Sequence, residues 1–534
     1  MILEVLKKAT KIKPDKINDD SLNGNTVISS LLISIFTILN IIIGFFFQIT
    51  LARFFGTTGE ADIYFAAITI PTLFNTVFIS AINITFLPTL VKHQTNKQGN
   101  DSTIIVRDFL LITAILLTVI ITLMIVFADN LLSVLFPGFS DEEIQATKQI
   151  FILLLPTIPL TIVVSISQSF YQAQRDFHIV AILPFTNNLV LLVITWVLVQ
   201  NLGITAIAIA TVLGNTIQLL LIKPYLQKIT TVLDFKKIPF HTDSLQVFKI
   251  MSPYILSAVF YKSNNLIDRF VASQFDTGTI SALGYAYRFM SSIQQILTQG
   301  ISIVFFSIMA AYVASNNTQK LQSILKQGVR WTIILSFPSA VFMAICGETV
   351  IRTLFEHGQF NSVATLKTAQ MLRAYLGAFV AGSIGSVLTY VFYAQQHTMT
   401  VALVGCAGFM VNLLAAIGLV PFIGEAAPAV AFSVASIFNF ALLAIILQRQ
   451  RILSCDTEIG LFTVKILISS IVASFSWYIG SVVINLLNVP LFINSISLSI
   501  NLAFGLSLFF ATGLLLRENE FVKIYRSIKV LIRR

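Results

Sequence analysis

The chain has 534 residues, of which 56% are hydrophobic and only 11% are charged, and its mean hydropathy is +0.86. A soluble protein of this length needs a far more polar surface, so the composition excludes a soluble protein and indicates a polytopic membrane protein. The net charge of +10 does not imply a nucleic-acid partner, and we expect none, because basic residues of membrane proteins gather in cytoplasmic loops.

Fourteen apolar stretches are candidates for helices that span a bilayer, which takes about 20 residues each. In chain order they are residues 26–48, 63–90, 109–128, 150–172, 179–198, 204–222, 250–271, 280–313, 331–346, 372–394, 400–420, 429–447, 464–484 and 493–515. We therefore predict an all-α polytopic membrane protein with 14 transmembrane helices. Its parts would be a cytoplasmic N-terminal segment at 1–25, an N-lobe at 26–222, a cytoplasmic linker at 223–249, a C-lobe at 250–447, two further helices within 448–516, and a basic cytoplasmic tail at 517–534.

The distribution of basic residues supports this arrangement. If the N-terminus is cytoplasmic, most of the 34 Lys and Arg residues lie on the cytoplasmic side, and the bias does not invert along the chain. The basic residues expected outside are Arg53, Lys148, Arg352, Lys367 and Arg373. We therefore expect a multi-pass protein of the bacterial inner membrane with both termini in the cytoplasm.

The two lobes resemble each other. The segment "FYQAQRDFHIVAILPFTNNLVLLV" begins at Phe170, and "FYAQQHTMTVALVGCAGFMVNLLAA" begins at Phe392. Six helices are thus repeated in the same orientation, followed by two extra helices. Parallel repeats related by an axis along the membrane normal occur in transporters, where the binding site lies between the halves.

Charged residues inside the seventh and eighth helices are the main candidates for function. Lys262, Asp268 and Arg269 lie in the stretch "YKSNNLIDRFVAS", and Arg288 lies in "GYAYRFMSS". A charge at the bilayer centre costs at least ~2.5 kcal/mol, so such residues usually face a cavity or a partner. One interpretation is a basic wall for an anionic head group, with Asp268 as an ion or proton site. The other is a structural Asp268–Arg288 ion pair, with Lys262 and Arg269 reaching toward water.

Asp62 follows the short segment that joins the first two spans. Gly56 and Gly59 there predict a tight turn, and we expect Asp62 to cap the N-terminus of the second helix. The sequence contains no Walker loop, no HExxH and no Gly-x-Ser-x-Gly motif. We therefore predict that the protein is not an enzyme.

Several segments resemble the MurJ/MviN family of lipid II flippases, within the multidrug/oligosaccharidyl-lipid/polysaccharide exporter superfamily. They include "LARFFGTTGEADIYFAAITIPTLFNTVF", "NNLIDRFVASQFDTGTISALGYAYRFM" and "LFEHGQFN". The resemblance implies a V-shaped cavity between two six-helix lobes, which admits a lipid-linked sugar head group. It also implies that Arg288 is a cavity arginine, that Asp268 and Asn412 belong to a sodium site, and that Asp62 matches the aspartate that opens the second helix.

The chain also departs from the family pattern. Ile41, Phe47 and Gln48 stand where the family's first helix carries two arginines and an aspartate, and Asn75 stands where the second helix usually carries an arginine. Two further sodium-site positions are Ala416 and Phe432. Losing charge-assisted contacts should weaken pyrophosphate binding. We expect Lys262 to compensate in part, in a divergent member whose cargo need not be lipid II.

The function predicted from the sequence is a flippase that moves a lipid-linked anionic saccharide, lipid II-type or related polyprenyl-linked, by alternating access. We expect a monomer in contact with membrane lipids, without a cofactor but with Na⁺ or H⁺ coupling. The predicted substrate-binding residues are Lys262, Arg269, Arg288, Asn75 and Asp62, and the predicted ion-coupling residues are Asp268 and Asn412. The alternatives are a cation-coupled small-molecule or drug antiporter of the same superfamily and a membrane scaffold that does not transport.

Overall fold

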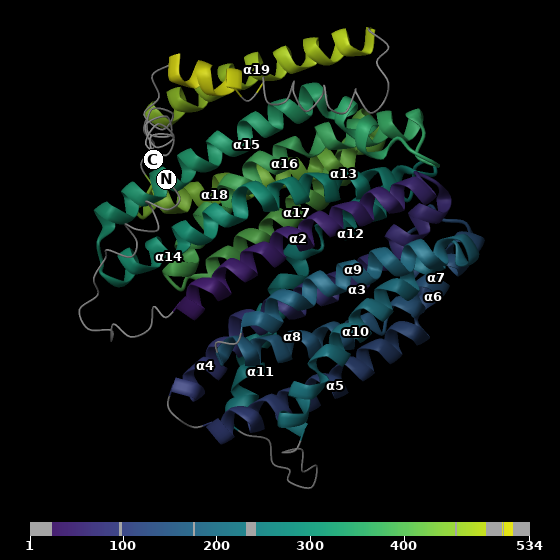
Figure 1. Ribbon diagram of the computed structural model, residues 1–534, viewed down its shortest axis with the longest axis vertical. Coiled ribbons are helices and arrows are strands. Elements are labelled where there is room, and N and C mark those ends of the chain that lie inside the picture. Colours follow the sequence, from purple (N-terminus) through teal and green to yellow (C-terminus); the bar gives the residue numbers. More distant parts are fainter. Residues whose placement is uncertain are drawn as a thin grey trace.

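The computed structural model describes residues 24–95, 99–174, 177–230, 242–453, 457–486, 505 and 507–515, and every regular element in these ranges is helical (Figure 1). The elements up to residue 230 are α2 (Gly24–Phe55), α3 (Gly59–Ala81), η2 (Ile82–Phe86), α4 (Leu87–Thr95), α5 (Gly99–Val126), α6 (Ala128–Leu135), α7 (Asp141–Leu154), α8 (Thr157–Ala173), α9 (Phe177–Leu202) and α10 (Thr205–Thr230). The later elements are α11 (Thr242–Lys262), α12 (Asn264–Ala272), α13 (Thr279–Gln294), η3 (Gln295–Gln299), α14 (Gly300–Ala314), α15 (Thr318–Phe355), α16 (Ser362–Ala394), α17 (Thr398–Ile423), η4 (Gly424–Ala426), α18 (Ala427–Arg449) and α19 (Thr457–Leu486).

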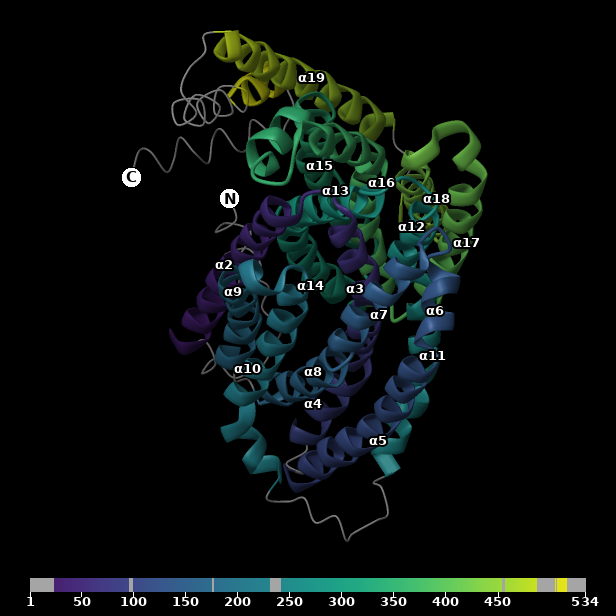
Figure 2. The ribbon, with the colours of Figure 1, turned by 90° about the vertical axis from the view of Figure 1, so that its right-hand side faces the viewer.

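The helices gather into two bundles (Figure 2). In the first bundle, α2 to α10, α9 packs against both α2 and α10, and α3 packs against α7 and α8. In the second bundle, α13 to α18, the long helix α16 packs against α13, α15 and α18, and α17 packs along α18. Helices α11 and α12 contact both bundles, through α3 on one side and α17 on the other, whereas α19 lies against α15.

The predicted membrane-spanning, all-helical fold is confirmed. Ten stretches of the described residues are long and apolar enough to cross a membrane, and one of them, Thr398–Arg449, contains two of the predicted spans. Among the fourteen predicted spans, 493–515 lies mostly outside the described residues, while 250–271 and 280–313 correspond to interrupted helices. The total of fourteen therefore stays a prediction.

The interruptions lie in helices that approach the space between the bundles. Helix α11 ends at Lys262 and α12 begins at Asn264, with Ser263 between them. Helix α13 continues through the π-helical turn η3 into α14, and α3 continues through the π-helical turn η2 into α4. Such turns bend a helix and are frequent at functional sites. The sequence analysis expected unbroken helices at these places.

The predicted span 150–172 is also interrupted: α7 ends at Leu154 and α8 starts at Thr157. Pro156 lies between them and has no backbone N–H to continue the helical hydrogen bonds. The predicted span 331–346 is too short, because α15 extends over Thr318–Phe355 with polar turns at both ends and an N-terminal cap from Asn317. Hydropathy marks only the apolar part of a helix, so it misses such ends.

At one end of the molecule the two bundles are in direct contact. This closed end comprises residues 53–62, 136–140, 273–281 and 356–361. The Gln359 amide donates a 2.9 Å hydrogen bond to the Arg53 carbonyl. A Cβ atom on Gly138 would overlap the Ser273 carbonyl, and a Cβ on Gly278, whose φ is +93°, would lie 2.5 Å from the Thr57 carbonyl oxygen. Glycine at these positions lets the two backbones approach without a gap.

The expectation that Asp62 caps its own helix is wrong. Thr58 occupies the N-cap position of α3, and Asp62 lies inside the first turns of that helix. Its carboxylate instead accepts hydrogen bonds from the backbone amides of Gly278 (2.6 Å) and Ser281 (2.7 Å) at the start of α13. The N-terminus of a helix carries a partial positive charge and free N–H groups, so it attracts this buried carboxylate.

Candidate functional site

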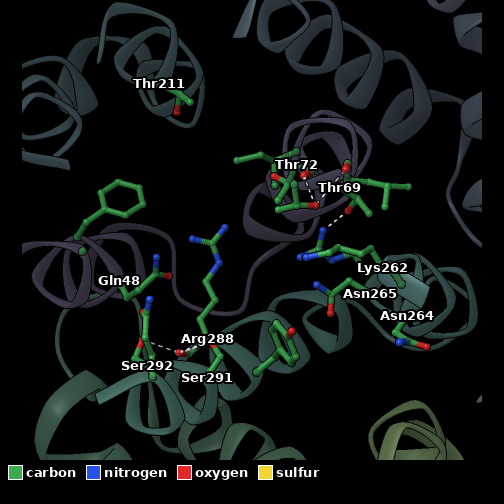
Figure 3. A pocket seen from close by; sticks show the side chains of 18 of the residues that line it. Gln48, Thr69, Thr72, Thr211, Lys262, Asn264, Asn265, Arg288, Ser291 and Ser292 are labelled. Carbon is green, nitrogen blue, oxygen red and sulfur yellow. Dashed lines mark hydrogen bonds between the residues drawn. The ribbon is translucent and has the colours of Figure 1, made fainter. Parts of the chain in front are cut away.

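A cavity of about 650 Å³ lies between the bundles (Figure 3). Its wall is built from α2, α3, α9 and α10 on the first-bundle side and from α11, α12, α13, η3 and one residue of α18 on the other. Ligand sites typically occupy roughly 300–1,000 Å³, so the size suits a polar head group.

Lys262, Arg269 and Arg288 all line this cavity, as the sequence suggested for charges that face water. No Asp or Glu is among the described residues that line it. In Figure 3 the Arg288 side chain extends into the space between Gln48 on one side and Lys262 and Asn265 on the other. A cavity whose charged groups are all cationic attracts an anion and repels an organic cation.

The two arginines are held by residues of the first bundle. The Arg269 guanidinium donates a hydrogen bond to the Thr69 hydroxyl. The Phe65 ring lies 5.6 Å from the Arg269 guanidinium carbon and 5.4 Å from that of Arg288. Neither arginine forms an ion pair with a described residue. The alternative of an Asp268–Arg288 ion pair is therefore not what this structure contains.

Asp268 is buried behind the cavity and does not line it. The Tyr375 hydroxyl donates a 2.7 Å hydrogen bond to its Oδ2. Its Oδ1 is buried and accepts no hydrogen bond from the described part of the chain. A buried carboxylate oxygen without a partner is costly, so this atom is a candidate site for a proton or a cation.

The residues that the family resemblance assigns to a sodium site do not complete one here. The Asn412 amide donates a 3.0 Å hydrogen bond to Asn264, and its own buried Oδ1 has no partner among the described residues. Ala416 has no side-chain oxygen, and the Phe432 ring packs against Tyr287 and Tyr375. No group of three or more His, Cys, Asp or Glu side chains suited to a metal ion is found in the described ranges.

The other two predicted binding residues lie outside the cavity. Asp62 is buried at the closed end, bonded to the first turn of α13. Asn75 lies on α3 but is not among the lining residues, and its Oδ1 is buried without a partner in the described part of the chain. Neither residue lines the cavity in this structure, and their role in binding a cargo stays a prediction.

The uncharged polar groups of the first-bundle wall were not predicted from the sequence. They are Asn40, Gln48, Thr72, Thr76, Asn188 and Thr211. In the sequence, Gln48 stands out only because it replaces a charged residue of the family pattern. Polar residues scattered over several apolar helices give no common pattern in sequence. The two walls of the cavity thus differ, one being cationic and the other neutral and polar.

Two helical bundles around a central polar cavity define the class of protein, an all-helical protein that spans the membrane. A solved structure of a lipid II flippase MurJ in an inward closed conformation is similar, with a TM-score of 0.74 and 23% identity over 90% of this chain and 99% of that one. An inward-facing multidrug resistance transporter of the MATE family is similar at a TM-score of 0.65 and 13% identity, over 76% of this chain and 94% of that one.

The model of the lipid II flippase MurJ family matches residues 51–516, and the chain belongs to this family. A probable lipid II flippase MurJ of Buchnera aphidicola subsp. Schizaphis graminum is 25% identical over 86% of this chain and 92% of the relative. A probable lipid II flippase MurJ of Rickettsia prowazekii is 25% identical over 92% and 97%. The resemblance found in the sequence is thus confirmed. The family and the apolar helices make the chain a multi-pass protein of the bacterial inner membrane, in a family of transporters rather than of catalytic enzymes.

Proposed function

We propose that this protein moves a lipid-linked anionic saccharide across the bacterial inner membrane, with the head group in the central cavity and the lipid tail in the bilayer. The observation that carries the proposal is the cavity whose charged lining residues are Lys262, Arg269 and Arg288, without a lining carboxylate. Charge-assisted hydrogen bonds from guanidinium groups to a phosphate are roughly twice as strong as neutral ones. The cargo is a lipid II-type precursor or a related polyprenyl-linked glycan.

Alternating access follows from the same arrangement. The N-lobe at 26–222 and the C-lobe at 250–447 would move against each other about the cavity, which is closed at one end by the contacts of Arg53, Gly138, Gly278 and Asp62. The positive-inside bias supports a cytoplasmic location for both termini, and the closed end would then face the periplasm. Breaking these contacts would release the head group outside.

A monomer suffices for this mechanism, because one chain supplies both walls of the cavity. Asp268 is the residue proposed to couple transport to a cation gradient, since its Oδ1 is buried without a partner among the described residues. The first-lobe arginines of the family are absent, so the three cations on α11 to α13 would bind the phosphate groups alone.

Complementation tests the cargo. Expression in a strain depleted of its own lipid II flippase should restore growth, and Arg288→Ala at equal protein level should not. If the unmodified protein is well expressed and growth is not restored, lipid II is not the cargo. Mass spectrometry of the lipids that accumulate after deletion in the native host would then identify the glycolipid that is.

The alternatives give different outcomes. A drug antiporter would alter drug susceptibility on deletion, although the cationic lining disfavours organic cations as its cargo. A scaffold would keep its phenotype in Asp268→Asn and Arg288→Ala at unchanged protein level, whereas a transporter would lose it.

A further inference from the structure

A cluster of three carboxamide side chains lies on the neutral wall of the cavity. Asn40, Gly44 and Gln48 follow each other at intervals of four residues on α2 and so share one face of that helix. Asn188 approaches this face from α9, and its Nδ2 donates hydrogen bonds to Asn40 Oδ1 (2.8 Å) and to the Asn40 carbonyl (3.3 Å). A Cβ on Gly44 would lie 3.1 Å from Asn188 Nδ2, so glycine leaves the room for this approach.

The cluster contains one buried polar atom that has no partner among the described residues. Gln48 is only 8% exposed, lines the cavity, and its Oε1 accepts no hydrogen bond from the described residues. The amide nitrogen of Asn188 donates to Asn40, and this hydrogen bond orients the Asn188 side chain. The Asn188 side-chain oxygen then remains as an acceptor. A buried polar atom without a partner, on a side chain that lines a cavity, favours a ligand that supplies the missing hydrogen bond once the side chain turns toward it.

We propose that Asn40, Gln48 and Asn188 form a subsite for an uncharged, hydroxyl- and amide-bearing sugar of the cargo. This inference rests on the proposed function and adds an orientation to it. The phosphate end lies against Lys262, Arg269 and Arg288 on α11 to α13, and the sugar that follows it lies against α2 and α9. Carboxamides both donate and accept hydrogen bonds, which matches sugar hydroxyl and N-acetyl groups, and they add no charge that would compete for the phosphate.

Lipid-binding measurements on the purified full-length protein test this subsite. The two probes are undecaprenyl diphosphate and undecaprenyl diphosphate linked to N-acetylglucosamine, and native mass spectrometry reports the affinity of each. The unmodified protein should bind the sugar-bearing lipid roughly tenfold more tightly, because a site built for hydroxyl groups leaves polar atoms unpaired when they are missing. Gln48→Leu and Asn188→Leu, on separate helices, should each reduce this preference to less than about threefold while binding of undecaprenyl diphosphate stays within about twofold.

Two further variants complete the design. Val193→Ala, on the exposed face of α9, should leave both affinities unchanged. Arg288→Ala should weaken both lipids alike. If Gln48→Leu and Asn188→Leu fold, as shown by unchanged gel filtration and thermal unfolding, and keep the preference for the sugar, the subsite is wrong although the proposed function stands. If the unmodified protein binds neither lipid, or Arg288→Ala weakens neither, the proposed function itself is overturned.

Discussion

Phe65 of the first bundle contacts two of the cations that line the cavity. Its ring is buried, lies near the guanidinium groups of both Arg269 and Arg288, and packs edge-on against Tyr285. Two cations that face one cavity repel each other, and an aromatic ring near both offsets part of that repulsion. We therefore expect Phe65, a residue of the first bundle, to hold both arginines in place beside the cavity.

Replacing Phe65 with leucine should reduce transport at least about fivefold, since two cation–π contacts are lost and each is worth about 0.5–2 kcal/mol. Phe78→Leu is the matched control, because Phe78 is a buried phenylalanine of the same helix that stacks on Phe74 instead of an arginine. Both variants should lose similar thermal stability, while only Phe65→Leu should lose transport in a vesicle assay. Equal transport by the two variants would refute a positioning role.

The side chains around Asp268 determine whether transport depends on Na⁺. Asp268 and Asn412 each offer one side-chain oxygen without a partner among the described residues, but Ala416 and Phe432 have no side-chain oxygen. A desolvated cation needs several oxygen atoms to replace its water shell. Replacing Na⁺ by K⁺ on both sides of the membrane should therefore change transport by less than about twofold. A strong stimulation by Na⁺ would show that other oxygens complete the site.

The sequence was most informative where a charge interrupts an apolar helix. Because burying a charge in hydrocarbon costs free energy, Lys262, Arg269 and Arg288 could be predicted as cavity residues. All three line the cavity, and their role in binding stays a prediction. Phe65 could not be found in this way, since one more aromatic residue in an apolar helix carries no signal. Asp62 was misassigned because its partners, Gly278 and Ser281, lie more than two hundred residues further on in the sequence.

At the scale of elements, the closed end depends on how the start of α13 meets α3. Asp62 bonds the first amides of α13, and Gly138 allows the Ser273 carbonyl to touch the segment between α6 and α7. Both contacts require that the two backbones approach closely. A methyl group added at Gly138 should therefore push the backbones apart and weaken the closed end.

Gly138→Ala should open the closed end. In a background without the three native cysteines, Ser292→Cys places a thiol in the cavity. With the closed end toward the periplasm, a membrane-impermeant maleimide added outside should label this thiol several-fold faster in Gly138→Ala than in the parent. Gly460→Ala is the control, because no atom lies within 4 Å of a Cβ there. Unchanged protection in Gly138→Ala would mean that another contact closes this end.

Hydropathy located the helices well, but it did not locate the breaks within them. Pro156 gives a local reason for the break between α7 and α8. Gly300 directly follows the π-helical turn at Gln295–Gln299, whereas no proline or glycine lies next to the break at Ser263. A window of neighbouring residues therefore does not locate the break at Ser263.

At the scale of the whole molecule, the cavity exists because two bundles meet at one end and leave space between them further along. The repeat at Phe170 and Phe392 and the basic loops predicted such halves, but not which walls would carry charge. The cationic wall and the neutral wall together favour a cargo with a phosphate at one end and uncharged polar groups at the other. The central claim is that the cations on α11 to α13 bind this phosphate during transport.

The most direct measurement is of head-group transfer in liposomes that contain the purified protein and an undecaprenyl diphosphate-linked saccharide. An enzyme added outside reports how much of the head group has become accessible. The unmodified protein should transfer the head group across the bilayer, and the double variant Arg269→Ala, Arg288→Ala should lose at least about 100-fold of that rate, since each charge-assisted contact is worth about 1.5–3 kcal/mol. Transfer by the double variant at the rate of the unmodified protein would contradict the account.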